Sequence, residues 1–435
     1  MAHCSFIQLL AVGVCAQLAG ALAPPLAWAQ DPGIRVPDPL SLEWCLETAQ
    51  HNNPDIAAER AAAEAALRRI RPAGSLEDPR LGYAAVNLPV GEWDFDSSPM
   101  SGNQFELQQK LPFPGLLGNR EAAARAAAAA AEEALADRRR RVSAEVERAW
   151  AALGFAQRAL EITESNIELL RQIAKIAEAK YRVGAGLQQD VMRAQVELTL
   201  LLEERLGRVA ALRTREARVS ALLDLPPSTS LPRTAGLRDA TPLPDLETLL
   251  ERLAETSPLL QAFSRQVEQQ EWVLRAAQLE GYPDVDLGIG YRLRAAAPGD
   301  PVSGDDFVSA GLTVRLPVDR GKWRERVAER DALVRRAKAA RRAALAQLRD
   351  SVRSTFADLA RADAQVALLE TGLLPQARQS LESSRSGYEV DKVDFLSLLD
   401  SRVKLLEAEL GLVRAVTDRR AAFAALEGAV GEVLR

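Results

Sequence analysis

The sequence predicts a mostly helical protein with a small β part, built from one structural unit that occurs twice. Three patterns indicate this fold class. Landmark residues recur at a nearly constant distance, long segments place apolar residues every three or four positions, and four short segments alternate apolar with polar residues. Hydrophobic residues form 47% of the 435-residue chain and aromatic residues only 5%, a composition that provides a large core and favours long helices.

The duplication rests on landmarks in corresponding places. Pro54 and Pro258 lie 204 residues apart (258 − 54 = 204), and Tyr181 and Tyr388 lie 207 residues apart (388 − 181 = 207). Differences in turn length account for so small a drift. The chain is therefore expected to contain two copies of one repeat.

Each repeat is expected to run from a short helix through two strands into a long helical hairpin. The first repeat covers residues 30–225 and the second covers 245–435. Residues 226–244 between them are rich in proline, so we expect an irregular linker there. The expected strands lie at about 81–88, 104–111, 284–294 and 306–316, and the expected hairpins at 116–223 and 321–430.

The strands carry the sharpest signal. From Val285 to Leu293 every second residue is apolar, and the residues between them are charged or glycine. The pattern repeats from Val308 to Leu316 and, more weakly, in the first repeat. Each segment is close to the roughly 9–11 residues that a tilted membrane strand needs. The alternative is an amphipathic hairpin on a soluble core, but four isolated strands with two long loops could cover little of one.

The long helices show a coiled-coil repeat. From Val142 to Tyr181 apolar residues follow steps of four and three without a break, the pattern of helices that supercoil around their neighbours. Counted from Leu116 this helix is roughly 100 Å long at 1.5 Å per residue. The alanine-rich run at 122–131 indicates close approach of a neighbouring helix.

The N-terminus is typical of a secretory signal peptide. An apolar stretch up to Leu26 precedes Ala27-Trp28-Ala29, so residues 1–29 are expected to be removed. An uncleaved membrane anchor and lipidation at Cys15 are the alternatives. After cleavage Cys45 is the single cysteine, expected to be a half-buried helix residue.

The composition argues against several function classes. A net charge of −5 argues against nucleic acid as a partner. His51 is the single histidine outside the expected signal, and nothing marks a nucleophile and acid around it, so no catalytic site is expected. One histidine, one cysteine and two methionines far apart offer no metal site, and no glycine-rich phosphate loop follows a strand. We expect neither a cofactor nor an enzyme.

Four strands are too few to close a membrane barrel, because the smallest single-chain barrels use about eight. An open sheet edge in lipid leaves unpaired backbone groups, at a cost of several kcal/mol each. Several copies are therefore expected to pool their strands, and a trimer would supply twelve.

Over essentially its whole mature length the chain resembles the TolC family of outer-membrane efflux proteins. The resemblance lies in the duplication, in the strand-to-helix corners and in the two helical tips at 181–191 and 387–400. It implies a homotrimer with a 12-stranded outer-membrane β-barrel and a periplasmic α-barrel, which docks to a periplasmic adaptor and an inner-membrane RND-type pump. The corner Pro-Phe-Pro-Gly is similar to heavy-metal efflux members. The corner residues are Pro112, Pro114, Gly115, Pro317 and Gly321.

The resemblance also implies a gate where the tips narrow the tunnel. Asp190 and Asp400 match positions of acidic residues near the pore, and a threefold assembly would turn each into a ring of carboxylates. Asp391, Lys392 and Asp394 crowd the second turn, with Lys392 as a candidate partner whose release would help opening. The sequence departs from the family at Ser397, where an acidic residue is common, and at Asp391, where glycine is usual. The alternative is that all are solvated turn residues.

The sequence thus predicts a passive exit channel in the outer membrane of a Gram-negative bacterium, extending into the periplasm, with heavy-metal cations as the leading substrate. The competing interpretation is a periplasmic coiled-coil adaptor or scaffold that never enters the membrane. It would explain the heptads but not the four alternating strands. Extraction separates the two, because a barrel needs detergent and a scaffold does not.

Overall fold

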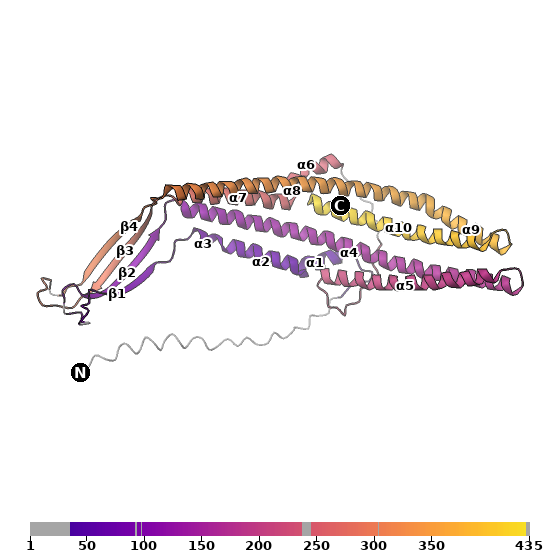
Figure 1. Cartoon of the computed structure of the whole chain (residues 1–435), viewed down its shortest axis with the longest axis horizontal. Coiled ribbons are helices and arrows are strands. Elements are labelled where there is room, and N and C mark those ends of the chain that lie inside the picture. Colours follow the sequence, from indigo (N-terminus) through magenta and orange to yellow (C-terminus); the bar gives the residue numbers. More distant parts are fainter. Residues whose placement is uncertain (1–34, 92–93, 97, 237–244, 303, 432–435) are drawn as a thin grey trace, which may run out of the picture. The chain divides into compact units, whose positions relative to one another are not determined.

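The computed structural model describes residues 35–91, 94–96, 98–236, 245–302 and 304–431 (Figure 1). The expected signal peptide and Cys15 lie outside these residues. From Asp38 onward the described residues pack as one compact unit, so the two repeats do not form separate domains.

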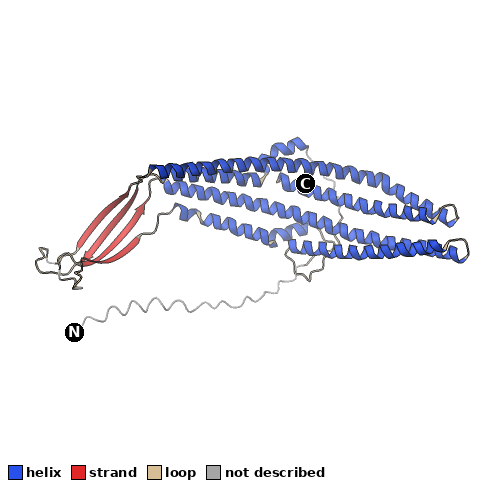
Figure 2. Cartoon of the chain, in the orientation of Figure 1, coloured by secondary structure: helices blue, strands red, loops and turns tan. Residues whose placement is uncertain are grey.

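Helices make up most of this unit, and the strands gather at one end of them (Figure 2). The first repeat contains α1 Leu42–Asn52, α2 Pro54–Arg68, α3 Ile70–Gly74, α4 Leu116–Arg182 and α5 Gln188–Leu222. The second contains α6 Leu246–Thr256, α7 Pro258–Leu279, α8 Arg320–Leu368, the π-helical turn η1 Leu369–Leu373, α9 Leu374–Glu389 and α10 Phe395–Val430.

The opening helix of each repeat is broken, which corrects the expectation of one continuous helix. The breaks come at Pro54 and Pro258, which lack the N–H that would continue the helix. The Asn53 side chain caps α2. Its oxygen accepts from the backbone N–H groups of Asp55 and Ile56 at 3.0 and 3.3 Å. Its buried amide also donates to the Leu222 carbonyl at 2.9 Å, fixing α2 to the end of α5.

The four strands form one antiparallel sheet in the order β1-β2-β3-β4. The central pair β2–β3 joins the repeats, with Phe105 opposite Tyr291. Each outer strand pairs with one neighbour only, so the outer edges of β1 and β4 are unpaired in a single copy. The strands are β1 Arg80–Val86, β2 Gly102–Leu111, β3 Asp284–Leu293 and β4 Phe307–Arg315.

The register places apolar residues in rows on one face of the sheet. One row joins Leu81, Leu107, Ile289 and Ala310 across all four strands. These side chains are uncovered, and Ile289 is 61% exposed. The opposite face carries charged, amide and glycine residues, so the sheet has one apolar side and one polar side.

The core lies between the helices. Near the tips, Leu170 of α4 and Leu398 of α10 are fully buried in a cluster that includes residues of α5 and α9. Several alanines of the run at 122–131 are buried on α4, as expected for close helix approach. None of the helices in the described residues is long and apolar enough to cross a membrane.

Cys45 is completely buried on α1 instead of half-buried as expected. Burial raises the pKa of its thiol to about 12, so the thiolate that reacts with maleimides is scarce at neutral pH. The folded protein is therefore expected to resist maleimide labelling at Cys45 and to label fully once unfolded. Mass spectrometry with a Cys45→Ser variant as control checks this, and rapid labelling of the folded protein at Cys45 would contradict it.

Candidate functional site at the helical tips and the corners

The first tip joins α4 to α5 through a tight turn. Gly184 adopts a left-handed backbone conformation, with φ +75°. Its N–H donates to the Tyr181 carbonyl at 3.0 Å, and the Ala185 N–H donates to the Lys180 carbonyl at 2.9 Å. These two bonds satisfy carbonyls that the helix end leaves free, which is the Schellman arrangement.

The second tip repeats this turn with an aspartate in the glycine position. Asp391 has φ +60° and donates its N–H to the Tyr388 carbonyl at 3.3 Å, while the Lys392 N–H donates to the Gly387 carbonyl at 2.8 Å. Asparagine and aspartate are among the few non-glycine residues that occupy this region. The second tip therefore keeps the turn geometry of the first and adds a carboxylate to it.

The two turns lie side by side and line one cavity of about 700 Å³. Asp190, Asp391, Lys392 and Asp394 all border it. Asp400 does not, and its carboxylate instead pairs with Lys404 at 2.6 Å on the exposed side of α10. The structure thus brings four of the five predicted tip residues together.

Lys180 connects the two tips. Its ammonium group pairs with the Asp391 carboxylate at 2.5 Å, donates to the Tyr388 carbonyl and lies 4.8 Å from the centre of the Tyr388 ring. The Lys180 side chain is only 13% exposed, which favours the ion pair over its hydrated state. Lys392, the partner expected from the sequence, makes no ion pair within the described part of the chain.

Tyr388 lies under this connection. Its ring packs against Phe395 with centroids 5.5 Å apart, and its hydroxyl is buried without a hydrogen-bond partner. Burial, together with the negative charges of Asp190 and Asp391, raises the pKa of the Tyr388 hydroxyl. The phenol therefore stays neutral and acts as an apolar support for the tip.

Asp394 has a local structural task. It precedes α10 and accepts from the Ser397 backbone N–H at 3.0 Å and from the Ser397 hydroxyl at 2.8 Å. These hydrogen bonds to the charged form lower the pKa of the Asp394 carboxyl. Ser397 thus completes a helix cap.

Two further ion pairs join the hairpins between the tips and the corners. Arg402 of α10 is buried and lies 3.6 Å from Glu197 of α5, with two of its guanidinium nitrogens lacking partners. Arg420 of α10 pairs with Glu147 of α4 at 2.6 Å, and both side chains are buried. The Arg402 pair is longer than the Arg420 pair, at 3.6 against 2.6 Å, so its charges attract each other less strongly.

The corners turn the chain from sheet to helix. Phe113 stacks on Tyr282 with centroids 4.6 Å apart, and its N–H donates to the Asp284 carboxylate at 3.3 Å, so the first corner is fixed to the start of β3. In the second repeat Pro317 lies between β4 and α8, and Gly321 lies within the first turn of α8. Asp319 caps α8 by accepting from the Lys322 N–H at 3.0 Å.

Gly115 starts α4 with φ +88°, a conformation that disfavours any side chain. Replacing it with alanine is expected to cost about 1–2 kcal/mol and to lower the temperature at which the purified protein unfolds. Gly118→Ala is the matched control, since Gly118 lies in the helix with open space around it and should gain up to about 1 kcal/mol. Equal effects of the two substitutions would contradict the assigned corner geometry.

Charged residues link the two corners on the polar side of the sheet. Glu280, at the end of α7, pairs with Arg120 of α4 and Arg326 of α8, both at 3.0 Å. Lys110 of β2 pairs with Glu77 at 3.0 Å and lowers the pKa of that carboxyl. These residues border a cavity of about 600 Å³ that opens on the polar face.

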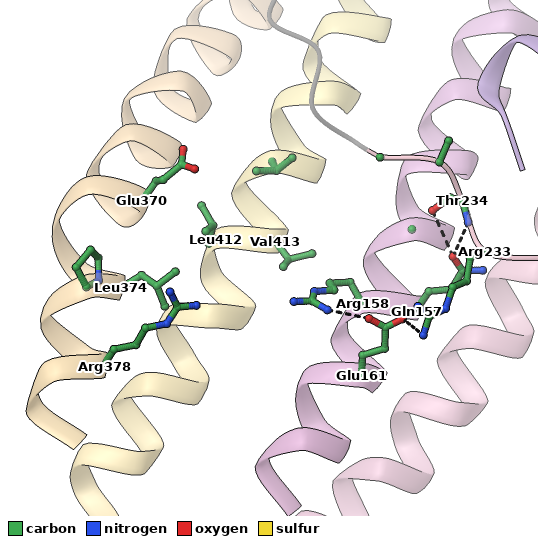
Figure 3. Close-up of a pocket in the computed structure, with 15 residues that line it drawn as sticks. Gln157, Arg158, Glu161, Arg233, Thr234, Glu370, Leu374, Arg378, Leu412 and Val413 are labelled. Carbon is green, nitrogen blue, oxygen red and sulfur yellow. Dashed lines mark hydrogen bonds and ion pairs between the residues drawn. The ribbon is translucent and has the colours of Figure 1, made fainter. Parts of the chain in front are cut away.

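A second cavity of about 600 Å³ lies halfway along the hairpins, between α4, α10 and the η1–α9 segment (Figure 3). The linker closes one side. Its Arg233 pairs with Glu161 of α4 at 2.5 Å, and Gln157 accepts from the Thr234 N–H at 2.9 Å. These contacts attach the linker to α4 and do not form a catalytic arrangement.

Sequence reasoning missed Lys180. Its neighbour Tyr181 marks the tip, and this was the only signal available, because the partner Asp391 lies 211 residues away. Within the described residues no group of three histidine, cysteine or acidic side chains could hold a metal ion.

The chain matches the family model described as "Outer membrane efflux protein" over residues 45–224 and 249–432. It is 23% identical over 383 residues to the cobalt-zinc-cadmium resistance protein CzcC of Cupriavidus metallidurans, covering 86% of this chain and 85% of that one.

Three solved structures share the fold. The outer-membrane channel OprN has a TM-score of 0.77 at 20% identity, covering 90% of each chain. VceC of Vibrio cholerae has a TM-score of 0.75 at 20% identity, covering 91% of this chain and 97% of that one. CusC, a protein that forms a transmembrane channel, has a TM-score of 0.75 at 16% identity, covering 90% of this chain and 92% of that one.

Proposed function

The chain belongs to the outer membrane efflux protein family, and we propose that three copies form one passive exit channel for heavy-metal cations. Members of this family are channels of the Gram-negative outer membrane that extend into the periplasm. The observation that carries the proposal is the sheet, with one uncovered apolar face and two unpaired edges.

The apolar face would meet lipid, and the unpaired edges would meet other copies. In lipid an unpaired edge costs several kcal/mol per backbone group, so β4 of one copy would pair with β1 of the next. Three copies supply twelve strands, with the polar face turned inward to line the pore.

The cargo is argued from similarity and from charge. The relative CzcC is a cobalt-zinc-cadmium resistance protein, and Asp190 and Asp391 line the cavity between the tips. Lys180 offsets the charge of Asp391, so threefold repetition of Asp190 would supply the ring of carboxylates that attracts divalent cations without a soft-ligand cage. A periplasmic adaptor and an RND-type pump would supply the energy.

The contacts of Lys180 with the second tip support a gate at this place. Lys180 holds the turn after α9 against the end of α4, so separation of the two hairpins requires the ammonium group to leave Asp391 and Tyr388. A docked partner could compensate for that loss, and the channel would then open only in the assembled pump.

Metal export is tested in a strain that lacks the gene. Cobalt, zinc and cadmium tolerance and retained metal, measured by mass spectrometry, are expected to return to normal with the wild-type protein. If the strain without the gene keeps its metal tolerance but becomes sensitive to drugs, heavy-metal cations are not the substrate, although the protein is still an efflux channel. No phenotype toward any solute would contradict efflux.

A further inference from the structure

The N-terminal two thirds of α8 is far more basic than the rest of the chain. Residues 320–353 contain twelve basic and four acidic side chains, a net charge of +8, whereas the whole chain has −5. Core packing does not need this excess, because the buried residues of α8 are valine, leucine and alanine.

Five of these arginines lie in a line along one side of the helix. Their spacings of 11, 7, 7 and 4 residues all fit the helical repeat, so they share one side. At 1.5 Å per residue the line is ~44 Å long. We name it the α8 stripe, and its members are Arg324, Arg335, Arg342, Arg349 and Arg353, all of them exposed.

The α8 stripe is largely free of partners inside the protein. Arg335 pairs with Asp331 one turn away, and the other four make no ion pair within the described residues. The contacts to α7 come from other basic residues. Arg326 pairs with Glu280 and Lys338 with Glu271.

The stripe lies on a different side of α8 from the residues that border the corner cavity. Trp323 and Arg326, which border the cavity on the polar side of the sheet, lie on a different side of α8. Between Val318 and Leu368 none of the described large hydrophobic residues is exposed. Protein interfaces rely on buried apolar or aromatic anchors, so this surface suits an extended polyanion better than a protein partner.

The duplication supplies an internal comparison. At the corner offset of 205, Arg335, Arg342 and Arg349 correspond to Ala130, Asp137 and Ala144 of α4, whereas Arg353 corresponds to Arg148 (353 − 205 = 148). A stripe required for the packing of the repeat would recur in α4. Its restriction to α8 indicates a separate use.

We infer that the α8 stripe binds peptidoglycan, through the free carboxylates on its peptide stems. Guanidinium groups match carboxylates in a two-pronged geometry, and peptidoglycan is the extended carboxylate polymer of the periplasm, where the family places these helices. This binding goes beyond export, and it depends on the outer-membrane location alone, not on the cargo or the gate.

The test uses the full-length protein, purified in detergent, and isolated peptidoglycan sacculi. The stripe variant carries Arg342→Gln, Arg349→Gln and Arg353→Gln. The control variant carries Arg139→Gln, Arg213→Gln and Arg215→Gln, three exposed arginines elsewhere that also make no ion pair within the described residues. Both variants lose three positive charges, so net charge is matched.

Wild type and control are expected to sediment with sacculi, and the stripe variant to bind about tenfold more weakly. Amidation of the sacculus carboxylates should abolish binding of all three. Equal binding by the two variants, or binding that survives amidation, would overturn the inference. So would loss of oligomerisation in the stripe variant alone, since the stripe would then contact a second copy.

Discussion

Replacing Lys180 with glutamine is expected to raise the conductance of the purified channel in planar bilayers several-fold. The change removes the ion pair to Asp391 and weakens the contact with the Tyr388 ring. The Lys180 side chain is 13% exposed but the Asp391 side chain is 66% exposed, so solvent screens the pair and its loss costs about 1 kcal/mol. The turn after α9 should then separate from α4 more often.

Lys175→Gln is the matched control, because Lys175 lies on the same helix, is exposed and makes no ion pair within the described residues. Trypsin provides a second readout, since Lys392 in the loosened turn should be cleaved faster in the Lys180 variant. Unchanged conductance and cleavage would show that the tip is not held by Lys180.

Replacing Ile289 with arginine is expected to abolish most of the assembled channel. Ile289 lies in the middle of β3 on the apolar face, opposite Leu107 and Ala310. Arginine at the membrane midplane costs ~2–4 kcal/mol in a barrel, and a trimer would carry the substitution three times.

Thr313→Arg is the control, because Thr313 lies on the polar face, opposite Asp286. The control should assemble at nearly the wild-type level, measured as trimer in outer-membrane fractions. Equal loss for both variants would mean that the two faces of the sheet do not meet different surroundings.

The parts of the fold that the sequence predicted were those written as short periodic patterns. The alternation of apolar and polar residues identified the strands that begin near Val285 and Val308. Apolar residues spaced by three and four identified the helix from Val142 to Tyr181. The sequence analysis did not predict the helix breaks at Pro54 and Pro258. Proline lacks a backbone N–H, so both breaks could have been predicted.

The π-helical turn could not be predicted. Between corner and tip the second repeat has two residues more than the first (207 − 205 = 2), and η1 takes up extra length without ending the helix. Sequence spacing reports the extra length but not where the helix absorbs it.

The tip was predicted as a place and only partly as a set of contacts. Asp190, Asp391, Lys392 and Asp394 do border one cavity, because the duplication puts both turns at the same level. The pairing of Lys180 with Asp391 depends on the rotation of α4 and α9 about their axes. No local pattern encodes that rotation, and Asp400 was placed at the pore by analogy alone.

The most direct test of the central claim, a channel closed by three copies in the outer membrane, is migration on a denaturing gel with and without boiling. The protein from outer-membrane fractions is expected to run unboiled at about three times the mass of its subunit and to collapse to one subunit on heating. A monomer found in the soluble periplasmic fraction would contradict the channel and favour a coiled-coil scaffold.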